Sequence, residues 1–193
     1  MFTDAIGALR DVLETGVHLE PVSIEERFRI DLMLGDITWQ GSYGLPGEGI
    51  APPVRADLEL EWSTWSQTSY RDWYLTQQLD EPPNILVEVT FRLDRLSCEP
   101  DPSLVIGVMP PNGPTLTGEP IRRATPTVQR SLDESLNTIE YGFEVAYEGE
   151  IVLDERALRD GSVLDDRFSS LGGWISSTLV RLGDLKLSHR TVD

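Results

Sequence analysis

The stretch "NILVEVTFRLDRL", residues 84–96, alternates apolar and polar side chains along its length. A period of two places alternate side chains on opposite faces of a β-strand, so this pattern predicts one buried and one solvated face. The inner set is Ile85, Val87, Val89, Phe91 and Leu93, and the outer set is Glu88, Thr90, Arg92 and Asp94. Strands with one wet face are typical of antiparallel sheets.

Other segments continue the alternation. It is clear in "TIEYGFEVAYEGE", residues 138–150, along residues 22–34, and at Leu58, Leu60 and Trp62. Shorter strands are expected at residues 104–108, 174–182 and 184–188. Because no repeated helix separates these segments, the pattern predicts a mainly β chain, folded as an antiparallel β-sandwich or a jelly-roll-like domain.

Helical spacing is evident at the N-terminus, where the apolar residues are Phe2, Ala5, Ile6, Leu9, Val12 and Leu13. We expect a single domain over residues 1–193, with an N-terminal amphipathic helix at 1–16 and the β-sandwich at 22–192. Residues 41–53 and 110–127 are rich in Gly and Pro and are expected to form long loops. Loops of this length are often functional, so they are expected to contact a neighbouring subunit or their own domain.

The charge balance limits the partners. The chain has 33 acidic residues against 16 basic ones, a net charge of −17, and Lys186 is its only lysine. Such a field repels phosphate groups, so neither nucleic acid nor a membrane surface is an expected partner. Arg122 and Arg123 form the one adjacent basic pair and are candidate partner-binding residues. The composition resembles that of proteins from salt-loving microbes, although a GC-rich genome also favours arginine over lysine.

Catalytic and cofactor motifs are not apparent. The one cysteine, Cys98, is expected to be buried and inert, and His18 and His189 are the only imidazoles. No nucleophile elbow, zinc-ligand spacing or phosphate-binding loop occurs, so we expect no enzyme, no metal and no cofactor. Glu59 and Glu61 share a strand face, which leaves a carboxylate-dependent glycoside hydrolase as one alternative.

An acidic segment at residues 153–166 allows two interpretations. Its carboxylates could bind calcium from a loop, but the spacing of an EF-hand is absent. A short acidic helix followed by a turn is the preferred interpretation.

The segment "EWSTWSQTSYRDWY", residues 61–74, concentrates aromatic side chains. Trp62 continues the inward phase and is expected in the core, while "SQTS" is interpreted as the turn of a hairpin. Trp65, Tyr70 and Trp73 would then stand near that turn, where they are expected to close the end of the sandwich or to bind a protein partner, with a platform for a sugar as the alternative.

These patterns favour a non-enzymatic structural or assembly subunit of a larger complex. A virion, neck or tail component of a halophilic system fits the acidic composition, with protein subunits as partners in a homo-oligomer or a hetero-assembly. A carbohydrate-binding β-sandwich module and the glycoside hydrolase remain alternatives. The N-terminal segment has no leader pattern and no long apolar run occurs, so the expected location is the cytoplasm or a particle assembled there.

Overall fold

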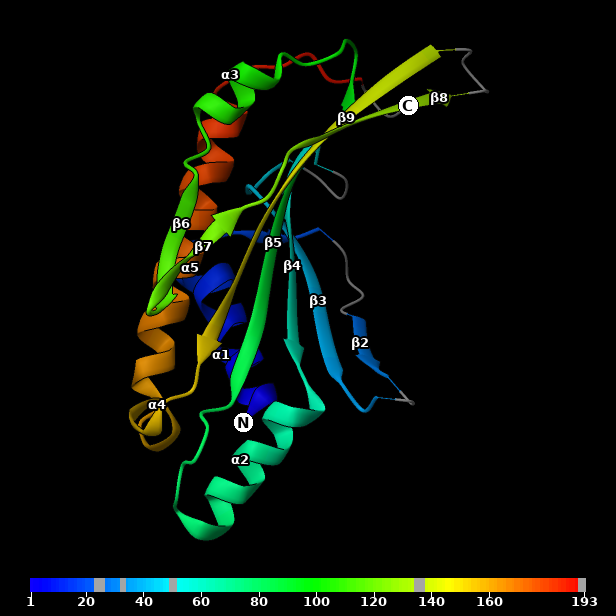
Figure 1. The fold of residues 1–193 in the computed structure, drawn as a ribbon. Helices are drawn as coiled ribbons and strands as arrows, with labels where there is room; N and C mark the ends of the chain where they lie inside the picture. The colour runs from blue at the N-terminus through cyan, green and yellow to red at the C-terminus, as the bar shows by residue number, and fades with distance from the viewer. Residues whose placement is uncertain (23–26, 32–33, 49–51, 134–137, 191–193) are drawn as a thin grey trace.

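The computed structural model describes residues 1–22, 27–31, 34–48, 52–133 and 138–190. Within these ranges nine strands form one antiparallel sheet with the order β1-β3-β4-β5-β9-β7-β6, in which β2 also pairs with β3 and β8 with β9 (Figure 1). The strands are β1 (Glu20–Pro21), β2 (Arg27–Ile30), β3 (Ile37–Gly44), β4 (Val54–Trp62), β5 (Asn84–Leu96), β6 (Asn112–Thr117), β7 (Glu119–Arg123), β8 (Thr127–Asp133) and β9 (Thr138–Val152). The helices are α1 (Phe2–Asp11), the π-helical turn η1 (Val12–Gly16), α2 (Thr64–Thr76), α3 (Pro102–Gly107), α4 (Glu155–Arg159) and α5 (Ser162–Gly183).

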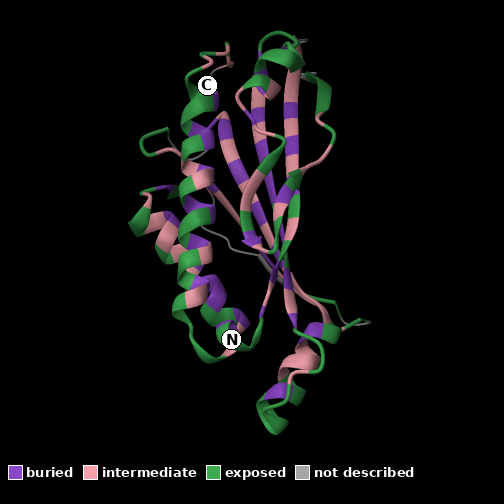
Figure 2. Ribbon diagram, turned by 60° about the vertical axis from the view of Figure 1, so that its left-hand side comes forward, coloured by how far each residue is buried: buried purple, intermediate pink, exposed green. Residues whose placement is uncertain are grey.

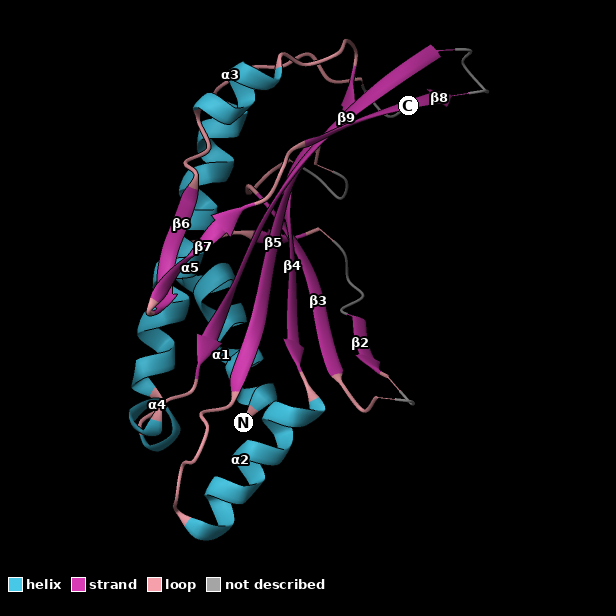
Figure 3. Ribbon diagram, in the orientation of Figure 1, coloured by secondary structure: helices cyan, strands magenta, loops and turns pink. Residues whose placement is uncertain are grey.

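The second layer of the fold is helical. Helices α1 and α5 lie along one face of the sheet (Figures 2 and 3). The buried side chains of the strands share one hydrophobic core with the buried side chains of these two helices. The antiparallel pairing and the N-terminal helix are confirmed. The sandwich or jelly-roll is not confirmed, because all the strands of the described ranges belong to one sheet.

Helix α5 supplies most of that second layer. Its buried side chains recur every three or four residues: Leu164, Phe168, Leu171, Ile175, Leu179 and Leu182. The prediction of strands at 174–182 and 184–188 is therefore wrong, since the first segment is helical and the second is a turn at 184–185 followed by irregular chain. A helical period needs about 11 residues or more to be recognised, and the nine residues from 174 to 182 also fit alternation.

The N-terminal helix packs closely on α5. A Cβ atom on Gly172 would lie 2.7 Å from Val12 Cγ1, so only glycine allows α5 and η1 to approach this closely. Phe2, Ile6 and Leu9 on α1 enter the same hydrophobic core as the inward side chains of β4, β5 and β9. This contact closes the helical face of the sheet.

The predicted loops are more ordered than expected. Residues 110–127 form the β6–β7 hairpin and the first residue of β8, so the prediction of a long loop there is wrong. Ile121 of this hairpin lies over Gly149 of β9, where a Cβ would stand 2.4 Å from Ile121 Cγ2. In the other segment, residues 41–44 complete β3, and residues 49–51 lie outside the described ranges.

Two more predicted strands differ from the structure. Residues 104–108 fall in and after α3, whose N-cap Asp101 accepts a hydrogen bond from Ser103 N at 2.9 Å. Of residues 22–34, only 27–30 form a described strand, and 23–26 and 32–33 lie outside the described ranges.

The aromatic segment forms α2 rather than a hairpin. Ser63 caps the helix, because its side chain accepts a hydrogen bond from Ser66 N, and Gln77 ends it with a left-handed conformation at φ 57°. Helix α2 projects beyond the lower end of the sheet in Figure 1. Of the helices described, none is long and apolar enough to span a bilayer.

Candidate functional site

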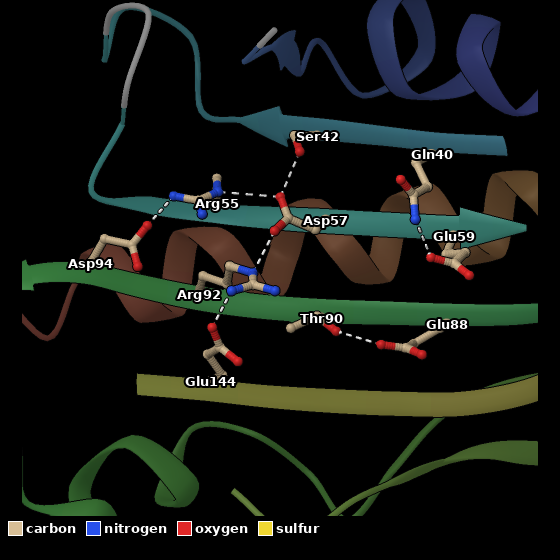
Figure 4. Close-up of polar contacts among 10 residues, drawn as sticks. All are labelled: Gln40, Ser42, Arg55, Asp57, Glu59, Glu88, Thr90, Arg92, Asp94 and Glu144. Atoms are coloured by element: carbon tan, nitrogen blue, oxygen red, sulfur yellow. Dashed lines mark hydrogen bonds and ion pairs between the residues drawn. The ribbon is translucent and has the colours of Figure 1, made fainter. Parts of the chain in front are cut away.

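The face of the sheet opposite α1 and α5 is the candidate site. Figure 4 views this face with α5 behind the strands and polar side chains of β3, β4, β5 and β9 in front. Strand register aligns these side chains in rows across the sheet, such as Gln40, Glu59, Glu88 and Glu148. The face divides into two regions with different charge.

The first region, which we call the ion-pair ladder, comprises Arg55, Asp57, Arg92, Asp94 and Glu144. Arg55 Nε lies 3.2 Å from Asp57 Oδ1, and the same guanidinium also pairs with Asp94. Arg92 Nε lies 2.5 Å from Asp57 Oδ2, and Arg92 also pairs with Glu144 (Figure 4). Each cation therefore has two carboxylate partners, and the ladder largely neutralises its own charge.

The second region is a hollow of about 450 Å³ over β4, β5 and β9, which we call the glutamate groove. Its lining is Glu59, Glu61, Leu86, Val87, Glu88, Glu148, Gly149 and Glu150. Leu86 is 44% exposed although it lies on a central strand. Five carboxylates thus surround one exposed apolar side chain.

The hydrogen bonds of these carboxylates come from neutral groups. Gln40 Nε2 donates to Glu59 at 2.5 Å, Thr90 Oγ1 donates to Glu88 at 2.9 Å, and Asn84 Nδ2 donates to Glu150 at 2.7 Å. Such donors orient the carboxylates but do not cancel their charge. The groove therefore keeps a strong negative potential.

Glu61 is affected by this crowding. Its burial, followed by the nearby carboxylates of Asp36 and Glu59, raises the pKa of Glu61 above its ordinary value. A carboxyl whose pKa is raised in the folded state favours folding only while it is protonated, so its contribution is lost as the pH rises through that raised pKa.

We expect Glu61→Gln to raise the midpoint of thermal unfolding at pH 7, because the amide carries no charge to desolvate. The gain should shrink as the pH falls and vanish below about pH 4, near the ordinary carboxyl pKa, where both folded and unfolded chains are protonated. The control is Glu99→Gln, which removes one charge from an exposed position outside the groove. An equal gain in both variants at pH 7 would mean that only net charge matters.

The histidines, the cysteine and the acidic segment were the other candidates for metal or catalytic chemistry. Among the described residues no group of three or more His, Cys, Asp or Glu side chains is placed to hold a metal ion. His18 is exposed, and Nδ1 of His189 lies 2.8 Å from the backbone carbonyl of Asp94. Cys98 is exposed rather than buried, which corrects that expectation. Residues 155–159 form the short helix α4, capped by Asp154 and followed by a turn, as preferred from the sequence, although the helix itself carries one glutamate and two arginines.

The predicted aromatic site residues do not share one exposed surface. Trp65 is 50% exposed and Tyr70 is half-buried, whereas Trp73 is only 7% exposed. The Tyr70 ring contacts Trp62 and Trp73 at centroid distances of 5.8 and 5.9 Å, and Trp62 reaches Phe2 of the core at 5.5 Å. Tyr70 and Trp73 therefore attach α2 to the body, and Trp65 alone stands outward.

The two predicted arginines lie on β7. Arg122 is exposed and pairs with Glu119 at 2.6 Å, and its strand position is opposite Glu148 at the rim of the groove. Arg123 is half-buried and donates to the carbonyl of Met109 at 2.5 Å, so it holds the hairpin in place. Only Arg122 is placed beside the candidate site.

Sequence reasoning missed Leu86, Glu88, Glu148 and Glu150 as site residues. Alternation put Glu88 and Glu148 on the outer face, but their proximity depends on the pairing of β5 with β9, in which these two residues are partners although they lie 60 positions apart in the sequence. The exposed Leu86 interrupts the polar outer set of its strand and was the available signal. Comparison with protein-family models, curated proteins and solved structures finds no match to this chain.

Proposed function

We propose that this chain is a non-enzymatic subunit of a larger protein assembly and that the uncovered face of its sheet is the docking surface. The observation that carries the proposal is the exposed Leu86 within a groove on a face that none of the described helices covers. Burial of an exposed apolar side chain by a partner contributes favourable binding free energy, and it contributes most at the centre of an interface. The ladder beside it, in which two arginines pair with three carboxylates, offers a polar rim.

A different protein fits this face better than a second copy. Two copies meeting face to face would bring the same five glutamates against each other. Opposed like charges across an interface cost several kcal/mol in order of magnitude, so they select against this pairing. A hetero-assembly is therefore the form of partnership that we propose.

The sugar-binding and glycosidase alternatives receive less support. Trp73 is buried, so it cannot stack on a sugar together with Trp65 and Tyr70. Glu59 and Glu61 lie two positions apart on β4, and the carboxylate of Glu59 already accepts a hydrogen bond from Gln40. The face offers a broad surface rather than an enclosed reaction site.

We propose that the chain is acidic because it is a virion component of a halophilic system. This proposal predicts that the thermal stability of the chain depends on salt concentration. At a net charge of −17, raising sodium chloride from about 0.1 M to 1 M shortens the Debye length from about 10 to 3 Å and should relieve self-repulsion. The midpoint of thermal unfolding should rise over that range. Chloride is chosen because sulfate also stabilises proteins by exclusion from their surface. A flat midpoint would remove the halophile argument.

The docking proposal is tested by site-specific photo-crosslinking in the cells that make the chain. A benzophenone amino acid is introduced at position 86, in the groove, or at position 180, on the solvent side of α5, where Val180 is 46% exposed. We expect a stoichiometric adduct from position 86 and none from position 180. Adducts at 180 alone, or none at either position, would contradict the proposal.

A further inference from the structure

Strand register sets glutamates directly opposite one another in the groove. Glu59 of β4 pairs with Glu88 of β5, and Glu88 pairs in turn with Glu148 of β9. Like charges directly opposite on neighbouring strands destabilise a sheet. This row therefore weakens the isolated fold, and stability alone does not account for it.

The next row shows what such a surface fits. Glu61, Leu86 and Glu150 are aligned across the same three strands, so the exposed apolar side chain lies between two carboxylates. Within the described ranges none of the five groove glutamates has an ion pair within 4 Å, whereas both arginines of the ladder are paired. Arg122 stands opposite Glu148 in register but pairs with Glu119.

We infer that the glutamate groove binds a cationic amphipathic segment of the partner protein, in which arginine or lysine side chains flank an apolar one. The inference rests on the proposed function and names the partner's chemistry. The apolar side chain covers Leu86, and the flanking cations meet the two rows of carboxylates. Binding relieves the cross-strand repulsion, so the groove is more stable when occupied.

Other occupants fit the surface less well. A second copy presents the same carboxylates, and nucleic acid presents phosphates, so both are repelled. In the part of the chain that the structure describes, the carboxylates do not form a group that could hold a metal ion. The cationic segment satisfies both the charge of the rows and the exposed leucine between them.

The probe is a synthetic peptide in which arginine and leucine alternate, with a second peptide that has serine in place of each leucine. Affinity is measured by calorimetry for the full chain, for Glu88→Gln/Glu148→Gln, and for the control Glu81→Gln/Glu99→Gln. The two double variants have equal net charge, and Glu81 and Glu99 are exposed residues outside the groove.

We expect the groove variant to bind the arginine–leucine peptide about tenfold more weakly, since paired charges at an interface contribute on that order, and the control variant to change about twofold or less. Leu86→Ser should lower the affinity of the chain for the arginine–leucine peptide and leave its affinity for the arginine–serine peptide unchanged. Equal losses in both double variants would mean that the peptide senses only net charge, and would overturn the inference.

Folding provides a second readout. Because the like charges repel, Glu88→Gln/Glu148→Gln should unfold at a higher temperature than the unchanged chain, and at a higher temperature than the control variant. A lower midpoint would contradict the repulsion on which the inference rests.

If position 86 crosslinks to a partner segment without cationic residues, the inference fails while the docking proposal stands. If no adduct forms, the docking proposal itself fails.

Discussion

Replacing Phe168 by alanine is expected to lower the free energy of unfolding by roughly 3–5 kcal/mol, the range for large buried aromatic side chains. Phe168 is fully buried on α5, where this helix forms the second layer over the sheet. Its removal would leave a cavity between that layer and the strands. Denaturant unfolding followed by far-UV circular dichroism measures the change.

The matched control for Phe168 is its neighbour Ser169, which is exposed on the same helix. Ser169→Ala should change the free energy of unfolding by about 0.5 kcal/mol or less, as is usual for surface positions. If the two substitutions had similar effects, α5 would not form the layer that we describe.

Trp73→Ala is expected to cost roughly 3 kcal/mol, whereas Trp65→Ala should cost less than about 1 kcal/mol. The two residues differ in exposure, 7% against 50%, although they lie on the same helix. Trp73 Nε1 has no hydrogen-bond partner among the described residues, so the loss in Trp73→Ala is one of packing. Trp73→Phe keeps most of that packing and should be much milder. Equal losses for Trp65→Ala and Trp73→Ala would contradict this division.

Alternation predicted the central strands well because it is strongest where a strand has one buried face. In β5, the inward Val87, Val89 and Phe91 are nearly inaccessible, and the outward Glu88 and Arg92 are not. The same reasoning placed the polar face correctly. It could not say what covers the other face, because either a second sheet or a layer of helices buries apolar side chains equally well.

Helices α2 and α3 were missed for local reasons. In α2, Ser63 is the cap that starts a helix, but the Ser and Thr residues that follow it also favour turns. In α3, Leu104, Ile106 and Val108 alternate over a segment too short to distinguish a helix from a strand. Both helices would have been predicted if the capping residues that start a helix had been given more weight than the alternation of apolar residues.

The candidate site was predictable only in its parts. The sequence indicates that Glu59, Glu61, Glu88 and Glu148 face outward, since each lies out of phase with the apolar set of its strand. Their meeting in one groove depends on the register of three strands that are distant in sequence. Register is fixed by long-range pairing, which a single sequence does not display.

The most direct test of the docking surface is carboxylate footprinting of the chain, alone and within its assembly. Carbodiimide labelling of Glu88 and Glu148 reports on the groove, and labelling of the exposed Glu155 on α4 serves as the internal reference. We predict that the isolated chain labels at all three positions and that the assembly protects Glu88 and Glu148 while Glu155 stays reactive. Unchanged labelling of Glu88 and Glu148 in the assembly would contradict the claim that the uncovered face of the sheet binds the partner.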